Sequence, residues 1–105
     1  MTLIVCVDQR NGLRFNNRRQ SSDRCVTERI NYLLADGKNT CFLENGDPFT
    51  YLKSVEKLIV FRWDKVYPAD TKFPMEDFLK QLTLQSRETF PGFSHELITQ
   101  EVYIR

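Results

Sequence analysis

The chain has 105 residues, of which 41% are hydrophobic and 28% are charged, and its formal net charge is +1. This length predicts a single domain, residues 1–105, with one modest core, and the composition is that of a folded rather than a disordered protein. The near-neutral charge argues against a general nucleic-acid-binding protein, since such proteins usually carry a strong basic excess.

The first third of the chain predicts a buried strand followed by an amphipathic helix. Residues Thr2–Val7 form a continuous apolar run rich in β-branched side chains, which is typical of a strand buried on both faces. Residues 14–24 form a polar, basic loop. Ser22 and Asp23 suit the start of a helix, because a Ser side chain accepts from a free N–H group and Asp opposes the positive end of the helix dipole. The expected apolar stripe of this helix consists of Val26, Ile30, Leu33 and Leu34.

Two more strands are predicted, at Thr40–Leu43 and Lys57–Trp63, with a short helix between them. Asp47 suits the cap of that helix and Pro48 its first position. The helix is expected to run to about residue 53. Its inward-facing side chains are expected to be Phe49 and Leu52.

The last third of the chain predicts a helix and a β-hairpin. Pro74 opens the helix, and its expected buried stripe consists of Phe78, Leu79 and Leu82. Residues Phe90–Phe93 fit a type II turn, with Pro at the second position and Gly at the third. Residues Leu97–Arg105 form a terminal strand of alternating character, so the final pair of strands is expected to be a hairpin.

Alternating strands and helices predict an α/β fold with a small, mainly parallel sheet that helices flank. Crossover connections in such sheets are right-handed. The C-terminal hairpin adds an antiparallel edge to the sheet.

Metal and thiol chemistry have little support in the sequence. The one histidine, His95, has no partner at ligand spacing, whereas a zinc site needs about four nitrogen or sulfur ligands, so we predict no metal site. The cysteines have no C-x-x-C spacing, which predicts reduced thiols packed as small hydrophobic side chains. No secretory signal and no apolar run near the roughly 20 residues of a membrane span is present, so we predict a cytoplasmic location.

An arginine-rich loop before the first helix is the most unusual feature. Its candidate ligand-binding residues are Asn16, Arg18, Arg19 and Arg24. Arginine suits bidentate contacts with phosphate, and the following helix would direct free N–H groups and a positive dipole end at the same region. A phosphate-bearing ligand is therefore one hypothesis. The alternative is a solvated loop whose arginines pair with Asp8, Asp23 and Glu28.

A second candidate ligand site is the turn formed by Asn45, Gly46 and Asp47. It lies between the carboxyl end of a predicted strand and the start of a predicted helix, which is where open α/β sheets bind ligands. One glycine is a weak signal, and an ordinary turn between a strand and a helix is the alternative.

Several segments of the chain resemble dihydrofolate reductase. Residues 3–13, Leu-Ile-Val-Cys-Val-Asp-Gln-Arg-Asn-Gly-Leu, are similar to that family's opening strand and the start of its mobile active-site loop. Residues 67–74 contain Asp-Thr-Lys-Phe-Pro, which resembles the family's Asp-Thr-x-Phe-Pro stretch after a late core strand. Gly46 and Tyr51 resemble a reduced form of the family's Gly-Gly turn and following Tyr, which approach the cofactor. Residues 101–105 look like its closing strand.

The chain also departs from that family. It is shorter, and it has no match for the middle segments that hold the family's adenosine-binding strands and phosphate-binding turns. NADPH, the cofactor that the resemblance implies, would therefore lose most of its contacts. Asn45 replaces one glycine of the paired turn. Thr27 lies closest to the position of the family's substrate-binding acid, and Asp23 and Glu28, the nearest acids, are the candidate catalytic residues.

The leading hypothesis is a shortened domain of this fold that lacks reductase activity and acts as a ligand-binding or interaction protein. An alternative is a minimal enzyme that acts on a nucleotide or pterin-like substrate, with NADPH as its candidate cofactor. A third hypothesis is an interaction module or a homodimer, because loss of the middle strands exposes a sheet edge and strand edges invite pairing.

Overall fold

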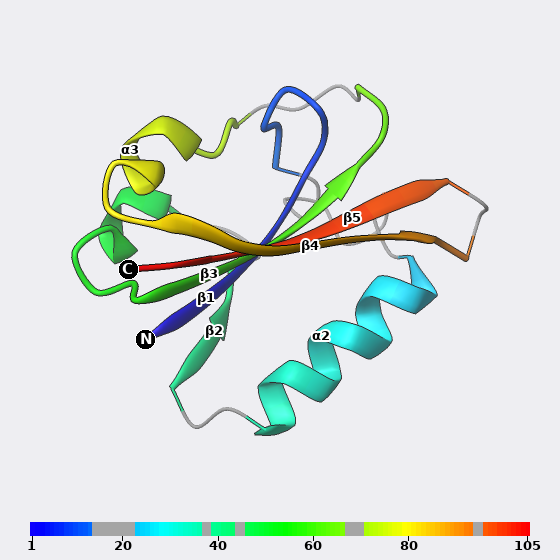
Figure 1. Ribbon diagram of the computed structural model, residues 1–105, viewed down its shortest axis with the longest axis horizontal. Helices are drawn as coiled ribbons and strands as arrows, with labels where there is room; N and C mark the ends of the chain where they lie inside the picture. The colour runs from blue at the N-terminus through cyan, green and yellow to red at the C-terminus, as the bar shows by residue number, and fades with distance from the viewer. Residues whose placement is uncertain (14–22, 37–38, 44–45, 67–70, 94–95) are drawn as a thin grey trace.

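The computed structural model describes residues 1–13, 23–36, 39–43, 46–66, 71–93 and 96–105, and a five-stranded sheet lies at its centre (Figure 1). In spatial order the strands are β2 (Thr40–Phe42), β1 (Thr2–Val7), β3 (Lys57–Trp63), β5 (Leu97–Ile104) and β4 (Thr83–Pro91). β1 is parallel to β2 and β3, whereas β5 is antiparallel to β3 and β4. This mixed sheet confirms the predicted α/β class, with parallel strands and a closing antiparallel hairpin.

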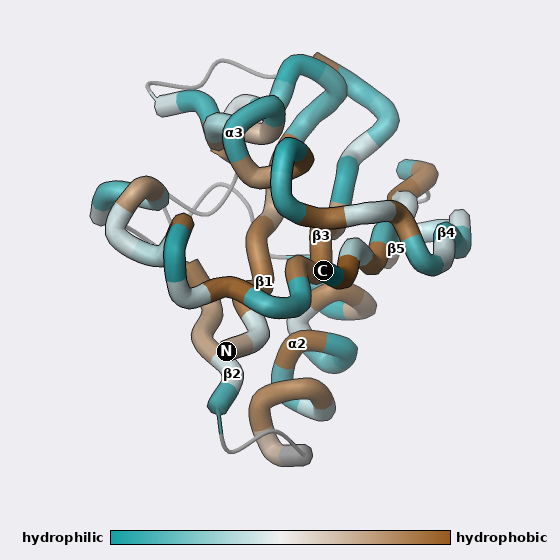
Figure 2. Tube along the Cα trace, turned by 60° about the vertical axis from the view of Figure 1, so that its left-hand side comes forward, coloured by the Kyte–Doolittle hydropathy of each residue, from teal (hydrophilic) through white to brown (hydrophobic). Residues whose placement is uncertain are grey.

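Helices cover both faces of the sheet. α2 (Arg24–Asp36) lies on one face, and the 3₁₀ helix η1 (Pro48–Tyr51) and α3 (Met75–Leu79) lie on the other (Figure 1). Alternate β1 side chains therefore enter two cores: Leu3 shares one with Phe78 of α3, and Ile4 shares the other with Val26 of α2. The prediction that β1 is buried on both faces is confirmed. Figure 2 shows hydrophobic residues concentrated in β1 and β3.

The apolar stripe of α2 is narrower than predicted. Val26 and Ile30 are buried and Leu33 is half-buried, but Leu34 is 36% exposed, so the prediction is wrong at that residue. At 3.6 residues per turn, a residue eight positions after Val26 is rotated by about 80° from it around the helix axis. That rotation carries Leu34 out of the contact with the sheet.

The short helix after β2 starts as predicted but buries a different residue. The Oδ1 atom of Asp47 accepts the N–H group of Phe49 at 3.0 Å, and Pro48 occupies the first helical position. Phe49 is 53% exposed, so the prediction that it faces inward is wrong, whereas Leu52 packs against the core. With about three residues per turn, the residue after the buried Pro48 must point away from the sheet.

The helix after Pro74 also buries only one side. Phe78 and Leu82 are buried as predicted, but Leu79 is 36% exposed. Met75 and Phe78 are three positions apart and share the buried side of α3. Leu79 follows Phe78 by about 100° around the helix axis and turns toward solvent.

The β4–β5 hairpin is present, but the type II turn predicted at Phe90–Phe93 is wrong. Pro91 still belongs to the β4–β5 ladder, and the N–H group of Gly92 donates to the carbonyl of Glu96 at 2.7 Å. A type II turn needs a positive φ at its third residue. Among the described residues, the glycine with a positive φ is Gly46, at 91°.

The structure also bears on the cysteine thiols, on metal binding and on membrane insertion. Cys6 is buried, Cys25 and Cys41 are partly buried, and none of the three forms a disulfide in the described structure. Within the described ranges, no three or more His, Cys, Asp or Glu residues form a group that could hold a metal ion. In those same ranges, no helix combines the length and the apolar character needed to cross a membrane. His95 lies outside the described residues.

Candidate functional site

The turn after β1 is fixed by a buried carboxylate. Asp8 is 1% exposed, and its Oδ1 atom accepts the N–H groups of Arg10 at 2.8 Å and Gly12 at 2.9 Å. Asn11 has a φ of 63° in this turn, a conformation that Asn tolerates better than most residues. Arg62 of β3 donates to the carbonyl of Asp8 at 2.9 Å and to Asn11 Oδ1 at 2.8 Å. The carboxyl ends of β1 and β3 are therefore tied together.

Residues 11–13 and 71–73, from two of the segments that resemble dihydrofolate reductase, lie side by side. The N–H group of Leu13 donates to the carbonyl of Thr71 at 2.9 Å, and that of Phe73 donates to the carbonyl of Asn11 at 2.7 Å. A hollow of about 280 Å³ opens beside them. Its lining carries both charges, from Arg10, Lys72, Glu76 and Asp77.

The candidate acid Asp23 caps the start of α2 and joins it to the hairpin. It is 6% exposed, and its Oδ1 atom accepts the N–H groups of Cys25 at 2.9 Å and Val26 at 3.2 Å at the start of α2. Its Oδ2 atom accepts the N–H group of Phe93 at 2.9 Å, beyond the end of β4. The expectation that this helix start presents free N–H groups to a phosphate is therefore wrong for Cys25 and Val26, because a carboxylate of the chain already occupies them.

The second candidate acid, Glu28, lies in a different environment. Its side chain is 69% exposed and pairs with Arg24 one helical turn earlier, at 3.3 Å. This pair matches the alternative in which an arginine of the basic region is neutralised by Glu28. Glu28 therefore faces water, while Asp23 is buried.

The structure describes only part of the predicted ligand site. Gly46 is exposed, and Asp47 caps η1 through Phe49. The remaining predicted ligand-binding residues lie outside the described residues: Asn16, Arg18, Arg19 and Asn45. Arg24 pairs with Glu28 one helical turn away, so the described contacts of Gly46, Asp47 and Arg24 are local.

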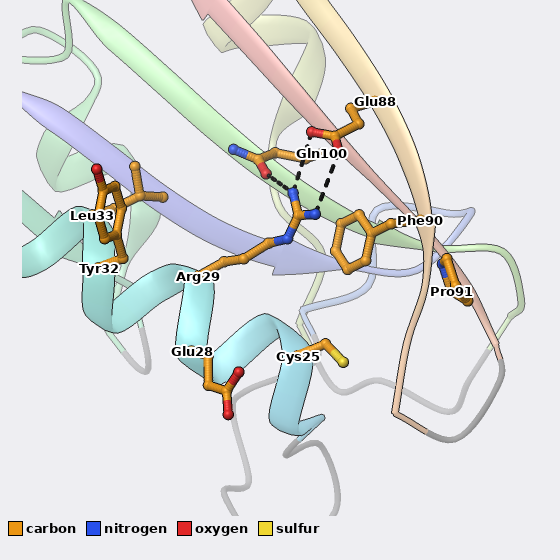
Figure 3. Close-up of a pocket in the computed structure, with 9 residues that line it drawn as sticks. All are labelled: Cys25, Glu28, Arg29, Tyr32, Leu33, Glu88, Phe90, Pro91 and Gln100. Carbon is orange, nitrogen blue, oxygen red and sulfur yellow. Dashed lines mark hydrogen bonds and ion pairs between the residues drawn. The ribbon is translucent and has the colours of Figure 1, made fainter.

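A groove that the sequence did not predict lies between α2 and β4, and we call it the α2–β4 groove. Its volume is about 630 Å³. Figure 3 shows its lining, which α2, β4 and β5 provide: Cys25, Glu28, Arg29, Tyr32, Leu33, Glu88, Phe90, Pro91 and Gln100. Tyr32 is 73% exposed, which is unusual for so large a ring.

Arg29 crosses the α2–β4 groove and joins its two walls. Its guanidinium group donates to Gln100 at 2.9 Å and to both carboxylate oxygens of Glu88, at 3.3 and 3.4 Å (Figure 3). It also lies 3.8 Å over the ring of Phe90, in a cation–π contact. Each charged side chain of the lining is paired, Arg29 with Glu88 and Glu28 with Arg24, which is not part of the lining. Tyr32, Leu33 and Phe90 supply the apolar surface of the groove.

Sequence reasoning missed this groove because it depends on strand order. Glu88 and Gln100 are neighbours only through the β4–β5 register, and Arg29 reaches them only because α2 covers that face of the sheet. The available signal was the position of Arg29 immediately before Ile30, at the border of the apolar stripe of α2.

A buried ionic cluster occupies the opposite face of the sheet. Glu101 of β5 is 5% exposed and pairs with Arg62 at 3.3 Å and with Arg87 at 3.3 Å. The hydroxyl of Tyr103 donates to the same carboxylate at 3.2 Å. Two guanidinium groups thus share one carboxylate, and this cluster carries a net positive charge.

Ionisation of Tyr103 is expected to lower the stability of the fold at alkaline pH. Burial, and then the neighbouring Glu101 carboxylate, raise the pKa of Tyr103 above its ordinary value of 10.0. Between the unfolded and folded pKa values the folded chain binds more protons, so the free energy of unfolding falls as pH rises through 10. We expect urea midpoints measured from about pH 8 to about pH 11 to fall at the alkaline end. Tyr103→Phe should flatten that decline, and an equally steep decline in this variant would contradict the assignment.

Comparisons with known proteins identify the fold. No family model matches the sequence, and no curated protein matches it. Among solved structures, dihydrofolate reductase from Enterococcus faecalis, in complex with NADP(H) and RAB-propyl, has a similar backbone, with a TM-score of 0.63. The match covers 99% of this chain and 95% of that chain, at 10% sequence identity. The chain therefore has a dihydrofolate-reductase-like fold.

Proposed function

We propose that this chain, given its dihydrofolate-reductase-like fold, is a binding domain without reductase activity and that the α2–β4 groove is its binding surface. The observation that carries the proposal is where the two candidate acids, Asp23 and Glu28, lie and what they contact. Asp23 holds two segments of the chain together, and Glu28 stands in water beside Arg24. Neither acid is placed to protonate a substrate in a site that excludes water.

Hydride transfer requires a nicotinamide held against a substrate ring, with an acid nearby that organises protonation. A proton on Asp23 would weaken its three bonds to backbone N–H groups, which hold α2 against the hairpin. Glu28 is 69% exposed, so a substrate bound to it would remain in contact with solvent. These observations weigh against both the reductase and the minimal-enzyme alternative.

The described residues also fit NADPH poorly. The resemblance places the cofactor at the turn after β2, where Gly46 leaves open space around its Cα. The next residue, Asp47, carries a carboxylate, which would repel the phosphates of a cofactor bound at this turn. The Oδ1 atom of Asp47 also takes the N–H group of Phe49, so that group is engaged within η1.

The activity test uses purified protein with NADPH and dihydrofolate. We expect no oxidation of NADPH above the rate without protein, while a dihydrofolate reductase assayed in parallel confirms the reagents. Oxidation at an enzyme-like rate would overturn the proposal, and its loss in Glu28→Gln would assign Glu28 as the acid of a minimal enzyme.

A thermal-shift screen of nucleotides and pterins locates any small ligand, because a ligand that binds only the folded state raises the melting temperature. A phosphate-bearing or pterin-like ligand remains a second proposal, for the side of the sheet where the carboxyl ends of the parallel strands β1, β2 and β3 lie. An increase that Tyr32→Ala removes would assign the ligand to the α2–β4 groove. An increase that this variant retains would place the ligand outside the α2–β4 groove.

A further inference from the structure

β4 is an edge strand with an open side. It pairs with β5, and in the part of the chain that the structure describes it is the last strand of the sheet. It is nine residues long, and all but one of its residues are exposed. The other edge strand, β2, is only three residues long. An exposed edge of this length presents backbone N–H and C=O groups to any extended segment that comes beside it.

The hydrogen-bond pattern shows which groups β4 presents. The first residue of β5 accepts the N–H group of Asp64, at 3.0 Å, on the β3 side. Because bonds alternate along an antiparallel strand, even-numbered residues of β5 bond to β4. Glu88 lies opposite Gln100 and therefore bonds inward. Its neighbours Arg87 and Thr89 must direct their N–H and C=O groups to the open side.

The side chains of β4 divide between two environments. Glu88 and Phe90 line the α2–β4 groove and contact Arg29. Arg87 and Thr89 lie on the opposite face, where Arg87 pairs with Glu101 and the hydroxyl of Thr89 lies 2.9 Å from that of Thr99. A strand added beside β4 would therefore alternate its own side chains between the groove and the positively charged cluster.

We infer that the open edge of β4 accepts an extended peptide segment as a sixth strand, one in which acidic residues alternate with apolar ones. The backbone groups of Arg87 and Thr89 supply the main-chain bonds, as in other cases of strand addition. The cluster of Arg62, Arg87 and Glu101 carries a net positive charge and attracts the acidic side chains. The groove, whose charged side chains are paired and whose wall carries Tyr32, receives the apolar ones.

A second copy of this chain fits the same edge less well. In a two-fold symmetric antiparallel pair of β4 strands, a register centred on Arg87 or on Glu88 sets like charges opposite each other, which is destabilising. A register centred on Thr89 places Pro91, which has no N–H group, opposite Arg87. A register centred on Ser86 meets the irregularity between Leu84 and Ser86. An acidic peptide need not mirror the sequence of β4, so it can avoid the like-charge pairs at Arg87 and Glu88.

The inference rests on the proposed use of the α2–β4 groove for binding, and defined peptides test it. The probes are capped hexapeptides in which Asp alternates with Val, Leu or Phe, and matched sets with Asn or Lys in place of Asp. We expect fluorescence anisotropy to detect binding of the Asp set in preference to the Asn and Lys sets. Arg87→Gln should remove the preference for Asp over Asn. No binding by any probe would overturn the inference.

Two substitutions at one position separate backbone pairing from side-chain effects. Thr89→Pro removes an outward N–H group at an edge, where proline is tolerated. We expect it to weaken peptide binding by about fivefold or more, since a hydrogen bond is lost. Thr89→Val keeps the N–H group and should bind as the unmodified protein does. Equal binding by both variants would overturn strand addition.

Hydrogen exchange on the unmodified protein gives an answer that does not depend on variants. Without peptide, the amides of Arg87 and Thr89 should exchange fast and those of Glu88 and Phe90 slowly; peptide should slow the first pair. Self-association that Thr89→Pro removes would instead assign the edge to a second copy and overturn the inference. Turnover of NADPH would overturn the proposed function alone. A small ligand that Tyr32→Ala displaces, with no peptide bound, would overturn only the inference.

Discussion

Glu101→Ala is expected to lower the free energy of unfolding by about 3 to 4 kcal/mol, because it removes one partner of a buried ion pair. The carboxylate lies between Arg62, whose side chain is 21% exposed, and Arg87, and it also accepts from Tyr103. Without the Glu101 carboxylate, the largely buried guanidinium group of Arg62 loses its counter-charge while it still bonds to the turn after β1. Urea denaturation followed by circular dichroism measures the loss.

Arg87→Gln is the matched control for this cluster. The Arg87 side chain is 57% exposed, so its pair with Glu101 is screened by water and should contribute less than about 1 kcal/mol. Glu101→Gln should fall between the two, since it retains the shape and a hydrogen-bond acceptor. If Glu101→Ala and Arg87→Gln had equal effects, Glu101 would not be a buried electrostatic centre.

Gly92→Ala is expected to destabilise the domain by about 2 to 3 kcal/mol, through overpacking. A Cβ atom at Gly92 would lie 2.6 Å from Asp23 Oδ2 and 2.7 Å from Ile98 Cδ1. Neither neighbour can yield easily: Asp23 is held by three backbone N–H groups, and Ile98 is fully buried. The substitution should therefore disturb the hairpin end and the start of α2 together, and thermal unfolding should show a lower melting temperature.

A second glycine and a double variant isolate the cause. Gly46 has a φ of 91° but nothing within 4 Å of an added Cβ, so Gly46→Ala should cost only the backbone strain, about 1 kcal/mol. In an Asp23→Ala background, Gly92→Ala should cost less than in the unmodified protein, because one of the two clashing groups is gone. Additive effects of these two substitutions would contradict a direct clash.

The sequence predicted the parts of the fold where one physical effect dominates. Residues 3–7 and 58–61 are continuous apolar runs because both of their faces are covered, and no other placement would bury them. The starts of α2 and η1 were predicted from Asp23 and Asp47, since helix starts depend on residues close in sequence. These effects need no knowledge of the tertiary structure.

Predictions that depended on the exact surroundings of a residue were less accurate. Leu34, Phe49 and Leu79 are apolar residues that lie one helical step away from the buried side, and a sequence pattern does not resolve that step in short helices. Gly92 was assigned to a turn for its backbone freedom, but it is needed because Asp23 and Ile98 come close to its Cα. That contact joins residues far apart in the chain.

The candidate site shows the same division. Asp23 is both a predicted helix start and a candidate catalytic acid. Its second oxygen accepts the N–H group of Phe93, 70 residues away, so its side chain joins two distant segments of the chain. The sequence alone does not indicate the role of Arg29, because its partners, Glu88 and Gln100, come together only through the β4–β5 register. Surfaces assembled from three elements leave little trace in any one of them.

The order β2-β1-β3-β5-β4 also has a kinetic consequence. β5 bonds to both β3 and β4, and β1 finds β3 only across a stretch that includes α2, β2 and η1. Much of the sheet thus closes large loops, and proteins dominated by such nonlocal pairings fold in roughly milliseconds to seconds rather than microseconds. Until β5 pairs with β3, the hairpin of β4 and β5 exposes both of its edges, so we expect it to be the segment most prone to aggregate.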